Sequence, residues 1–295
     1  MTADAGPRIQ TIRLGDWEVA GFVERRFALD GGTMFGVVPR SMWQKLLPPD
    51  HDNRVPMQTN LALIKTGDAN ILLDSGLGET LSDMDIKIYD PRGPSHMDES
   101  LRALGVPPEE LTHLIFTHLH TDHANGAFAG LADKPRLRFP NAEFYVQRDE
   151  WEDAFHPDER SRAVYTEHRL ALLEKSGRLH LLDGDTEILP GISVAKTGGH
   201  TRGHQGVRVT NGGQHFFYYA DIIPSHFHLK TPYVAAVDQF PLDTIKAKKA
   251  LLADALDKNA IVEFDHDSEI MFGLLVQKEK WIDIVPVDGQ PVAAN

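Results

Sequence analysis

Short apolar runs separated by turn-forming residues recur along the chain and predict a strand-rich fold. Apolar and polar residues alternate loosely over residues 8–23, around the turn signal Gly15-Asp16, which predicts an opening hairpin. A second hairpin is predicted at residues 60–74, around Gly67-Asp68. Further strands are predicted at residues 114–116, 143–146, 179–182, 192–196, 207–210, 215–220 and 260–264.

Segments with helical signals lie between these strands. They span residues 98–104, 149–155, 159–175 and 243–256, and the last has Asp243 as its expected N-cap. The residues 28–58, rich in Gly, Pro and Asp, and the polar residues 79–97 are predicted to be irregular. Long irregular stretches inside a compact domain are more often functional than idle. The order of elements indicates the α/β class, with two strand-rich halves that helices close.

Composition narrows the class of protein. With 41% apolar residues, the 295-residue chain can form an ordinary packed globule. A net charge of −13 argues against nucleic-acid binding, which needs a basic face. No apolar run in the sequence approaches the roughly 18 residues of a membrane span, and residues 1–8 lack a signal-peptide pattern. We therefore expect a cytoplasmic protein with neither nucleic acid nor a membrane as partner.

Potential metal ligands crowd one short stretch. Directly after the apolar run at residues 114–116 comes the sequence His118-Leu119-His120-Thr121-Asp122-His123, which places these side chains where a buried strand ends. Residues two apart in an extended segment point the same way, so His118 and His120 can bind one ion. Asp122 and His123 follow where the chain turns, and can face a second ion. Since the chain has no cysteine, His, Asp or Glu must bind the metal, and zinc accepts imidazole nitrogen and carboxylate oxygen together.

This stretch resembles the His-Xaa-His-Xaa-Asp-His signature of the metallo-β-lactamase superfamily. Three later segments resemble the remaining motifs of that superfamily in order: Gly199 to His204, Ala220-Asp221 and Phe264 to Asp267. The resemblance covers about residues 30–270 and implies a four-layer αβ/βα sandwich. Because the ligands are spread from residue 118 to residue 266 and must meet in one site, we expect a single domain spanning residues 1–295.

The resemblance also implies two divalent metal ions, with zinc as the expected metal. Two sets of three residues would each hold one ion: His118, His120 and His200 in the first set, and Asp122, His123 and His266 in the second. Asp221 would bridge the two ions, and Asp74 would orient ligand histidines without binding metal. Two such ions can share a hydroxide that attacks a carbonyl carbon. Asp122 is also a catalytic candidate, as a group that receives or relays a proton.

Within the superfamily, residues 30–39 and Trp43 resemble the YtnP-type branch of quorum-quenching lactonases. This resemblance implies a small-molecule lactone or ester substrate, with an N-acyl-homoserine lactone as the first candidate, and it allows a homodimer. In that branch the region corresponding to residues 28–58 lies over the active site and at the dimer contact. The apolar side chains of Met34, Phe35 and Trp43 could therefore bury an acyl chain, or they could pack on the core or at a dimer contact.

One departure from the lactonase pattern leaves a role to be filled. Several acyl-homoserine lactonases carry a Tyr three residues after the bridging Asp, where it donates to the substrate carbonyl, and here that position is Pro224. His228 is the candidate catalytic donor in its place, and a role in a surface loop is the alternative interpretation.

Other activities of the superfamily use the same hydroxide, so the metal motif cannot separate them. The alternatives are an organophosphate triester hydrolase, a glyoxalase-type thioesterase and a β-lactamase. A non-catalytic metal-binding module would be expected to lose ligands, and this chain retains all seven. A flavodiiron-like reductase would replace some histidines with carboxylates and add a flavin domain, and the sequence shows neither change.

Overall fold

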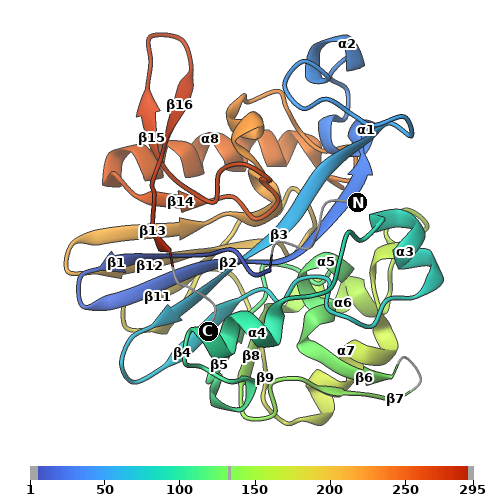
Figure 1. Ribbon diagram of the computed structural model, residues 1–295, viewed down its shortest axis with the longest axis vertical. Helices are drawn as coiled ribbons and strands as arrows, with labels where there is room; N and C mark the ends of the chain where they lie inside the picture. The colour runs from blue at the N-terminus through green and yellow to red at the C-terminus, as the bar shows by residue number, and fades with distance from the viewer. Residues whose placement is uncertain (1–5, 132–133, 292–295) are drawn as a thin grey trace.

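Two large β-sheets pack face to face in the computed structural model, with helices on their outer faces (Figure 1). The structure describes residues 6–131 and 134–291. The first sheet contains β1 (Ile9–Leu14), β2 (Trp17–Asp30), β3 (Arg54–Lys65), β4 (Asn70–Leu73), β5 (His113–Ile115), β8 (Glu143–Gln147), β9 (Leu179–Leu182) and β17 (Gln290–Pro291). Its eight strands are ordered β17-β1-β2-β3-β4-β5-β8-β9.

The second sheet has seven strands that lie in chain order. They are β10 (Thr186–Leu189), β11 (Ile192–Lys196), β12 (Gln205–Asn211), β13 (Gln214–Tyr218), β14 (Ile261–Glu263), β15 (Phe272–Gln277) and β16 (Ile282–Pro286). A separate hairpin is formed by β6 (Phe128–Leu131) and β7 (Lys134–Leu137).

Helices cover both sheets and the connections between strands. The α-helices are α1 (Gly31–Phe35), α2 (Arg40–Trp43), α3 (Asp83–Tyr89), α4 (Met97–Ala103), α5 (Thr121–Ala124), α6 (Arg148–Phe155), α7 (Glu167–Lys175) and α8 (Pro241–Lys258). Short 3-10 turns are η1 (Pro108–Glu110), η2 (Asn125–Ala127), η3 (Arg162–Val164), η4 (Ala220–Ile222) and η5 (His226–Leu229). Within the described part of the chain, no helix is both long enough and apolar enough to cross a membrane.

The layering follows from strands that are apolar on both faces. In β13, Phe216 and Tyr218 pack between the sheets, while Phe217 and the following Tyr219 pack with α8. The first sheet is also apolar on both faces. Ile115 of β5 faces the second sheet, while the adjacent Leu114 and Phe116 pack with residues of α4 and α7. Side chains alternate between the faces of a strand, so such continuous apolar runs are expected where both faces are buried. The predicted four-layer αβ/βα sandwich is confirmed.

Parallel pairing brings the strand ends to one edge of the sandwich. In the first sheet β4 pairs parallel with β5, and in the second β13 pairs parallel with β14. The carboxyl ends of parallel neighbours lie at the same edge, so the loops that leave these four strands meet. Those loops carry most of the predicted ligands.

Both predicted irregular stretches contain regular structure. In the first, β2 and β3 continue their pairing as far as Asp30 and Arg54, and α1 and α2 form the connection between them. Apolar residues on this extension, such as Phe27 and Val55, are buried against the connection, which explains its regular structure. The second stretch contains α3, whose start is fixed by a capping box between Ser82 and Asp85.

Two helix predictions are also corrected. The segment 159–175 is not one helix, because residues 162–164 form the separate turn η3 and α7 begins only at Glu167. Helix α8 begins at Pro241, so Asp243 is not its N-cap. Proline suits the first helical position because it lacks the N–H that would remain unpaired there. Asp243 lies in the first turn instead. Both predicted hairpins are confirmed, as β1–β2 and β3–β4.

The extension of β2 and β3 has its own apolar core, in which Trp43 is buried. Its ring stacks on Phe35, with centroids 5.3 Å apart, and its exposed fraction is 2%. The stability of the extension therefore depends on this ring. We expect Trp43→Ala to lower the free energy of unfolding by about 3–5 kcal/mol, as is typical for a buried aromatic residue.

Urea unfolding measures the effect of Trp43→Ala, with the neighbouring exposed Met42 as the control position. Met42→Ala should change the free energy of unfolding by less than about 0.5 kcal/mol. If Trp43→Ala unfolds at the wild-type urea concentration, the ring does not hold the extension together.

Candidate metal centre

The candidate site lies at the edge where the strand ends meet. His118 to His123 follow β5 and include α5, His200 lies between β11 and β12, and His266 follows β14. Asp221 lies in η4, directly after Ala220, whose φ of +44° is in the left-handed region. That conformation costs about 1–3 kcal/mol for a residue with a Cβ, and here it turns the chain sharply after β13.

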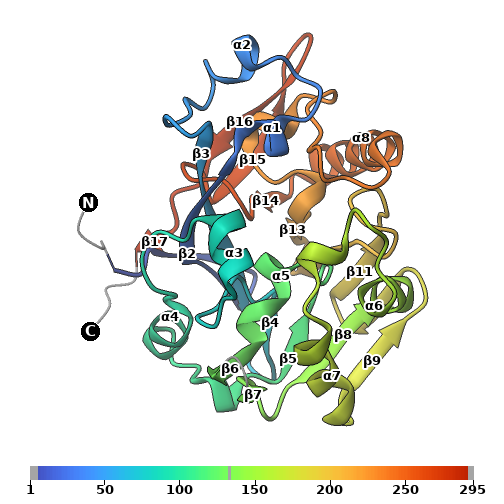
Figure 2. The ribbon, with the colours of Figure 1, turned by 90° about the vertical axis from the view of Figure 1, so that its right-hand side faces the viewer.

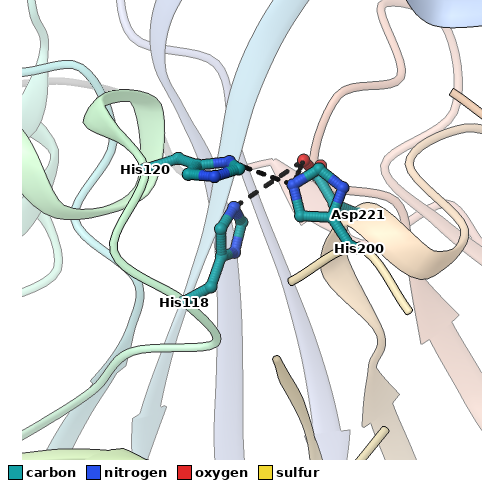
Figure 3. A group of neighbouring side chains, drawn as sticks. All are labelled: His118, His120, His200 and Asp221. Atoms are coloured by element: carbon teal, nitrogen blue, oxygen red, sulfur yellow. Dashed lines mark hydrogen bonds and ion pairs between the residues drawn. The ribbon is translucent and has the colours of Figure 1, made fainter. Parts of the chain in front are cut away.

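The first predicted ligand set is brought together in the structure. Potential ligand atoms of His118, His120, His200 and Asp221 all lie within 4.8 Å of one another (Figure 3). The Nε2 atom of His200 lies 2.9 Å from Asp221 Oδ2 and 3.0 Å from His120 Nδ1. His118 Nε2 is 3.8 Å from the same carboxylate oxygen. Three imidazoles and one carboxylate therefore converge on one point.

A second group of potential ligands adjoins the first and shares Asp221 with it. It consists of His123, Asp221, Asp265 and His266, again with ligand atoms within 4.8 Å of one another. The other oxygen of Asp221, Oδ1, lies 3.1 Å from His266 Nε2 and 3.6 Å from His123 Nε2. One carboxylate thus faces both groups, as the bridging prediction for Asp221 requires.

Asp122 lies at the margin of the second group. Its Oδ2 atom is 3.5 Å from His266 Nε2 and 4.0 Å from His123 Nε2. Its Oδ1 atom accepts a hydrogen bond of 3.1 Å from the Tyr89 hydroxyl at the end of α3, which lies beside α5 (Figure 2). The assignment of Asp122 as a ligand remains a prediction.

Hydrogen bonds at Nδ1 orient four of the histidines. The partner atoms are Thr117 Oγ1 for His118, Asp74 Oδ2 for His123, Asp238 Oδ1 for His200 and the Gln58 carbonyl oxygen for His266, at 3.1, 2.9, 2.8 and 3.1 Å respectively. Because Nδ1 is occupied in each ring, Nε2 is the nitrogen presented to the centre. Outer hydrogen bonds of this kind fix the ring orientation of metal-binding histidines.

Of these orienting residues, the sequence analysis predicted Asp74 but not Asp238. Asp74 was predicted to orient ligands, and it accepts hydrogen bonds from the backbone and hydroxyl of Thr117 as well as contacting His123. Asp238 was missed, because it lies 38 residues from His200 with no motif around it. Only the tertiary fold brings its carboxylate to the ring.

Unpaired buried atoms show that these residues fit a divalent cation. Among the described residues, His118 Nε2, His120 Nε2 and Asp221 Oδ1 are buried without a hydrogen-bond partner. A buried polar atom without a partner costs free energy; a cation held by the first group would satisfy His118 Nε2, and one held by the second group would satisfy Asp221 Oδ1. Imidazole nitrogen and carboxylate oxygen are a donor set that suits zinc and similar divalent metals.

The electrostatics of the site favour an ionised Asp221. Burial raises the pKa of Asp221, but His200, His123 and His266 outweigh burial and hold it well below its usual value. Burial lowers the pKa of His123, and Asp221, Asp122 and Asp74 together overcome this effect and raise it to about 9. The carboxylates therefore attract positive charge to this point, which a metal ion can supply in place of protons.

The catalytic prediction for His228 is corrected. Its Nδ1 atom lies 2.7 Å from Ser225 Oγ, and its Nε2 atom lies 2.8 Å from the carbonyl oxygen of Met34. The ring is 2% exposed and stacks on Phe35, and burial lowers its pKa to about 4. With both nitrogens engaged, His228 holds η5 against α1 and has no free N–H for a substrate.

A cavity of about 180 Å³ opens over the two groups. Atoms of both groups line it, and apolar side chains form much of its wall, including Leu29, Met34, Ile88, Val164 and Val237. Of the three apolar residues proposed for acyl-chain binding, Met34 lines the cavity. Phe35 and Trp43 pack in the core of the extension.

Tyr89 also lines the cavity, and the sequence analysis did not predict it as a site residue. It is the last residue of α3, in a stretch predicted to be irregular, so no pattern pointed to it. Burial, reinforced by the neighbouring Asp122, raises the pKa of its hydroxyl well above the usual value. The hydroxyl is therefore a hydrogen-bond donor beside Asp122, in the cavity that Pro224 also lines.

The sandwich fold and the paired His and Asp groups at one edge define a metal-binding α/β protein. Residues 54–266 match the model of the metallo-beta-lactamase superfamily, and the chain belongs to this superfamily. An N-acyl homoserine lactonase of Bacillus thuringiensis is 28% identical over 172 residues, which are 57% of this chain and 61% of that protein. The chain therefore matches less than two thirds of the length of this curated relative.

Solved structures share the fold over nearly the whole chain. A probable metal-dependent hydrolase from Staphylococcus aureus has a TM-score of 0.87 and 27% identity, covering 95% of this chain and 100% of its own. The dizinc quorum-quenching lactonase AidC, in complex with a product, has a TM-score of 0.79 and 20% identity, covering 97% of this chain and 100% of its own.

Proposed function

We propose that this protein is a lactonase that opens N-acyl-homoserine lactones with two divalent metal ions, expected to be zinc. The observation that carries the proposal is the cavity, which joins an apolar wall to both groups of potential ligands. An N-acyl-homoserine lactone has a polar ring and an apolar chain, which match these two parts. The sequence match to N-acyl homoserine lactonases of Bacillus supports the same substrate.

The metal centre would include His118, His120, His200, Asp122, His123, His266 and Asp221. Bound there, two divalent ions would supply an activated water nucleophile and polarise the lactone carbonyl. Since the ligand groups draw on loops from both sheets, we infer that the two halves act as a single domain.

Residues of the cavity would position the substrate and move its protons. The wall formed by Met34, Ile88 and Val237 would bury the acyl chain and exclude water from it. Asp122 would accept the proton that the attacking water loses, and would return it to the ring oxygen that leaves. The Tyr89 hydroxyl, which donates to Asp122 in this structure, would turn from Asp122 to donate to the carbonyl oxygen as negative charge develops there, the role for which Pro224 offers no donor.

Tyr89→Phe tests this role because it removes only the hydroxyl. We expect kcat to fall about 100-fold with little change in KM, the loss typical of one oxyanion donor. Steady-state kinetics on N-hexanoyl-homoserine lactone measure the effect, and metal content should stay at the wild-type value. Tyr145→Phe is the matched control, because Tyr145 lies in β8 between the rings of His113 and His180 and should show wild-type kinetics. Wild-type kcat in Tyr89→Phe would remove Tyr89 from the mechanism.

Hydrolysis rates on a substrate panel test the proposed function. The panel contains homoserine lactones of several acyl lengths, simple lactones, paraoxon, S-lactoylglutathione and a cephalosporin. We expect the highest kcat/KM on a homoserine lactone. A higher value on paraoxon, the thioester or the cephalosporin would instead assign the site to that reaction.

A further inference from the structure

Asp265 is a buried carboxylate that the proposed reaction does not use. Its side chain is 1% exposed, and it follows Phe264, the first residue after β14. Both of its side-chain oxygens are buried without a hydrogen-bond partner among the described residues. Its Oδ2 atom nevertheless lies 3.4 Å from His266 Nε2 and 4.0 Å from His123 Nε2, so the carboxylate points at the second ligand group.

Two other buried carboxylates near the site, Asp74 and Asp267, accept hydrogen bonds from several donors. Asp74 receives hydrogen bonds from Thr117 and Tyr218 and contacts His123. Asp267, two residues after Asp265, accepts from the backbone N–H groups of His226, Glu269 and Ile270. Asp265 differs from these two residues, because neither of its oxygens has such a donor.

The free-energy cost of burying the unpaired Asp265 carboxylate indicates that a cation binds beside it. An ionised carboxylate buried without partners is very unfavourable, and Asp265 also has the like charge of Asp221 beside it. Glu263 also lacks hydrogen-bond partners, but it belongs to neither group of convergent ligand atoms, whereas Asp265 does.

We propose that Asp265 is a further direct ligand of the second metal ion, in addition to the predicted ligands Asp122, His123 and His266 and the bridging Asp221. The two ions would then differ in charge environment. The first would have Asp221 as its single anionic protein ligand, and the second would have Asp122 and Asp265 in addition. This inference rests on the two-metal part of the proposed function and does not depend on the lactone substrate.

Metal binding by Asp265→Asn tests the proposal directly. Wild type and variant are stripped with a chelator and titrated with Zn²⁺ against a chromophoric competitor, and Co²⁺ spectra report the ligand environment. We expect the variant to bind the second ion at least about 100-fold more weakly, beyond the 10–100-fold typical of an outer residue. The affinity for the first ion should stay within about threefold, since its imidazole ligands are untouched.

Asp238→Asn is the matched control, because Asp238 contacts the ring of His200 in the first group. This variant should bind the first ion about 10–100-fold more weakly, and its affinity for the second ion should be unchanged. Asp265→Asn that binds both ions with wild-type affinity and spectra would overturn the proposal.

A crystal structure of the Zn²⁺-loaded wild type keeps the proposal testable if Asp265→Asn does not fold. An Asp265 oxygen should lie about 2.0–2.2 Å from the second ion, and a distance beyond about 3 Å would contradict direct binding. Because both measurements report metal binding, a failure to hydrolyse lactones would reject the proposed function and leave this result standing.

Discussion

Asp221→Asn is expected to lower kcat by about 1,000-fold, which corresponds to about 4 kcal/mol of transition-state stabilisation. Its two oxygens lie 2.9 Å from His200 Nε2 and 3.1 Å from His266 Nε2, so the side chain serves both ligand groups. Asparagine keeps the size and one oxygen acceptor but loses the negative charge. The first ion would then have only neutral protein ligands, so we expect the affinity for this ion to fall most.

Kinetics and metal titration of Asp221→Asn separate the loss of the bridging charge from a general loss of structure. KM should rise far less than kcat falls, the pattern for an interaction made mainly in the transition state. Asp243→Asn, an exposed carboxylate in the first turn of α8, should behave as wild type. If Asp221→Asn binds two ions tightly and turns over normally, the bridge must be another carboxylate.

His200→Ala should remove the first ion and reduce activity at least about 1,000-fold, while leaving the fold intact. The ring is fully buried between Asp221 and Asp238, and its Nε2 atom is the nitrogen that faces the centre. The sandwich core does not include this ring, so circular dichroism should match the wild type.

Metal analysis and activity are measured together for His200→Ala. His215→Ala is the control histidine, since His215 lies in β13 beside Thr210 and outside both ligand groups. It should retain wild-type metal content and turnover. Wild-type metal content in His200→Ala would show that the first ligand set is assigned incorrectly.

The structure brings most of the predicted ligand residues together, and the sequence could anticipate this because several of them are local. His118, His120 and His123 lie within six residues directly after β5, so the local chain alone places them close together. Asp238 and Tyr89 are different, because only tertiary packing brings them to His200 and Asp122. No spacing in the sequence encodes the contact between Tyr89 and Asp122, which are 33 residues apart.

The errors in the sequence interpretation have a common physical origin. His228 was selected for its distance along the chain from Asp221, but η5 turns its ring toward Ser225 and Met34. The glycines and prolines of residues 28–58 suggested a loop, but apolar residues on the extended strands decide the local structure there. In both places tertiary burial overrides the local signal.

We expect two divalent ions bound at this site to support the hydrolysis of a homoserine lactone. Stripped protein is titrated with Zn²⁺, and the hydrolysis of N-hexanoyl-homoserine lactone is followed at each step. We expect turnover to rise until about two equivalents per chain are bound and then to stay constant, as a two-metal mechanism requires. Turnover that is complete at one equivalent, or that needs no metal, would contradict it.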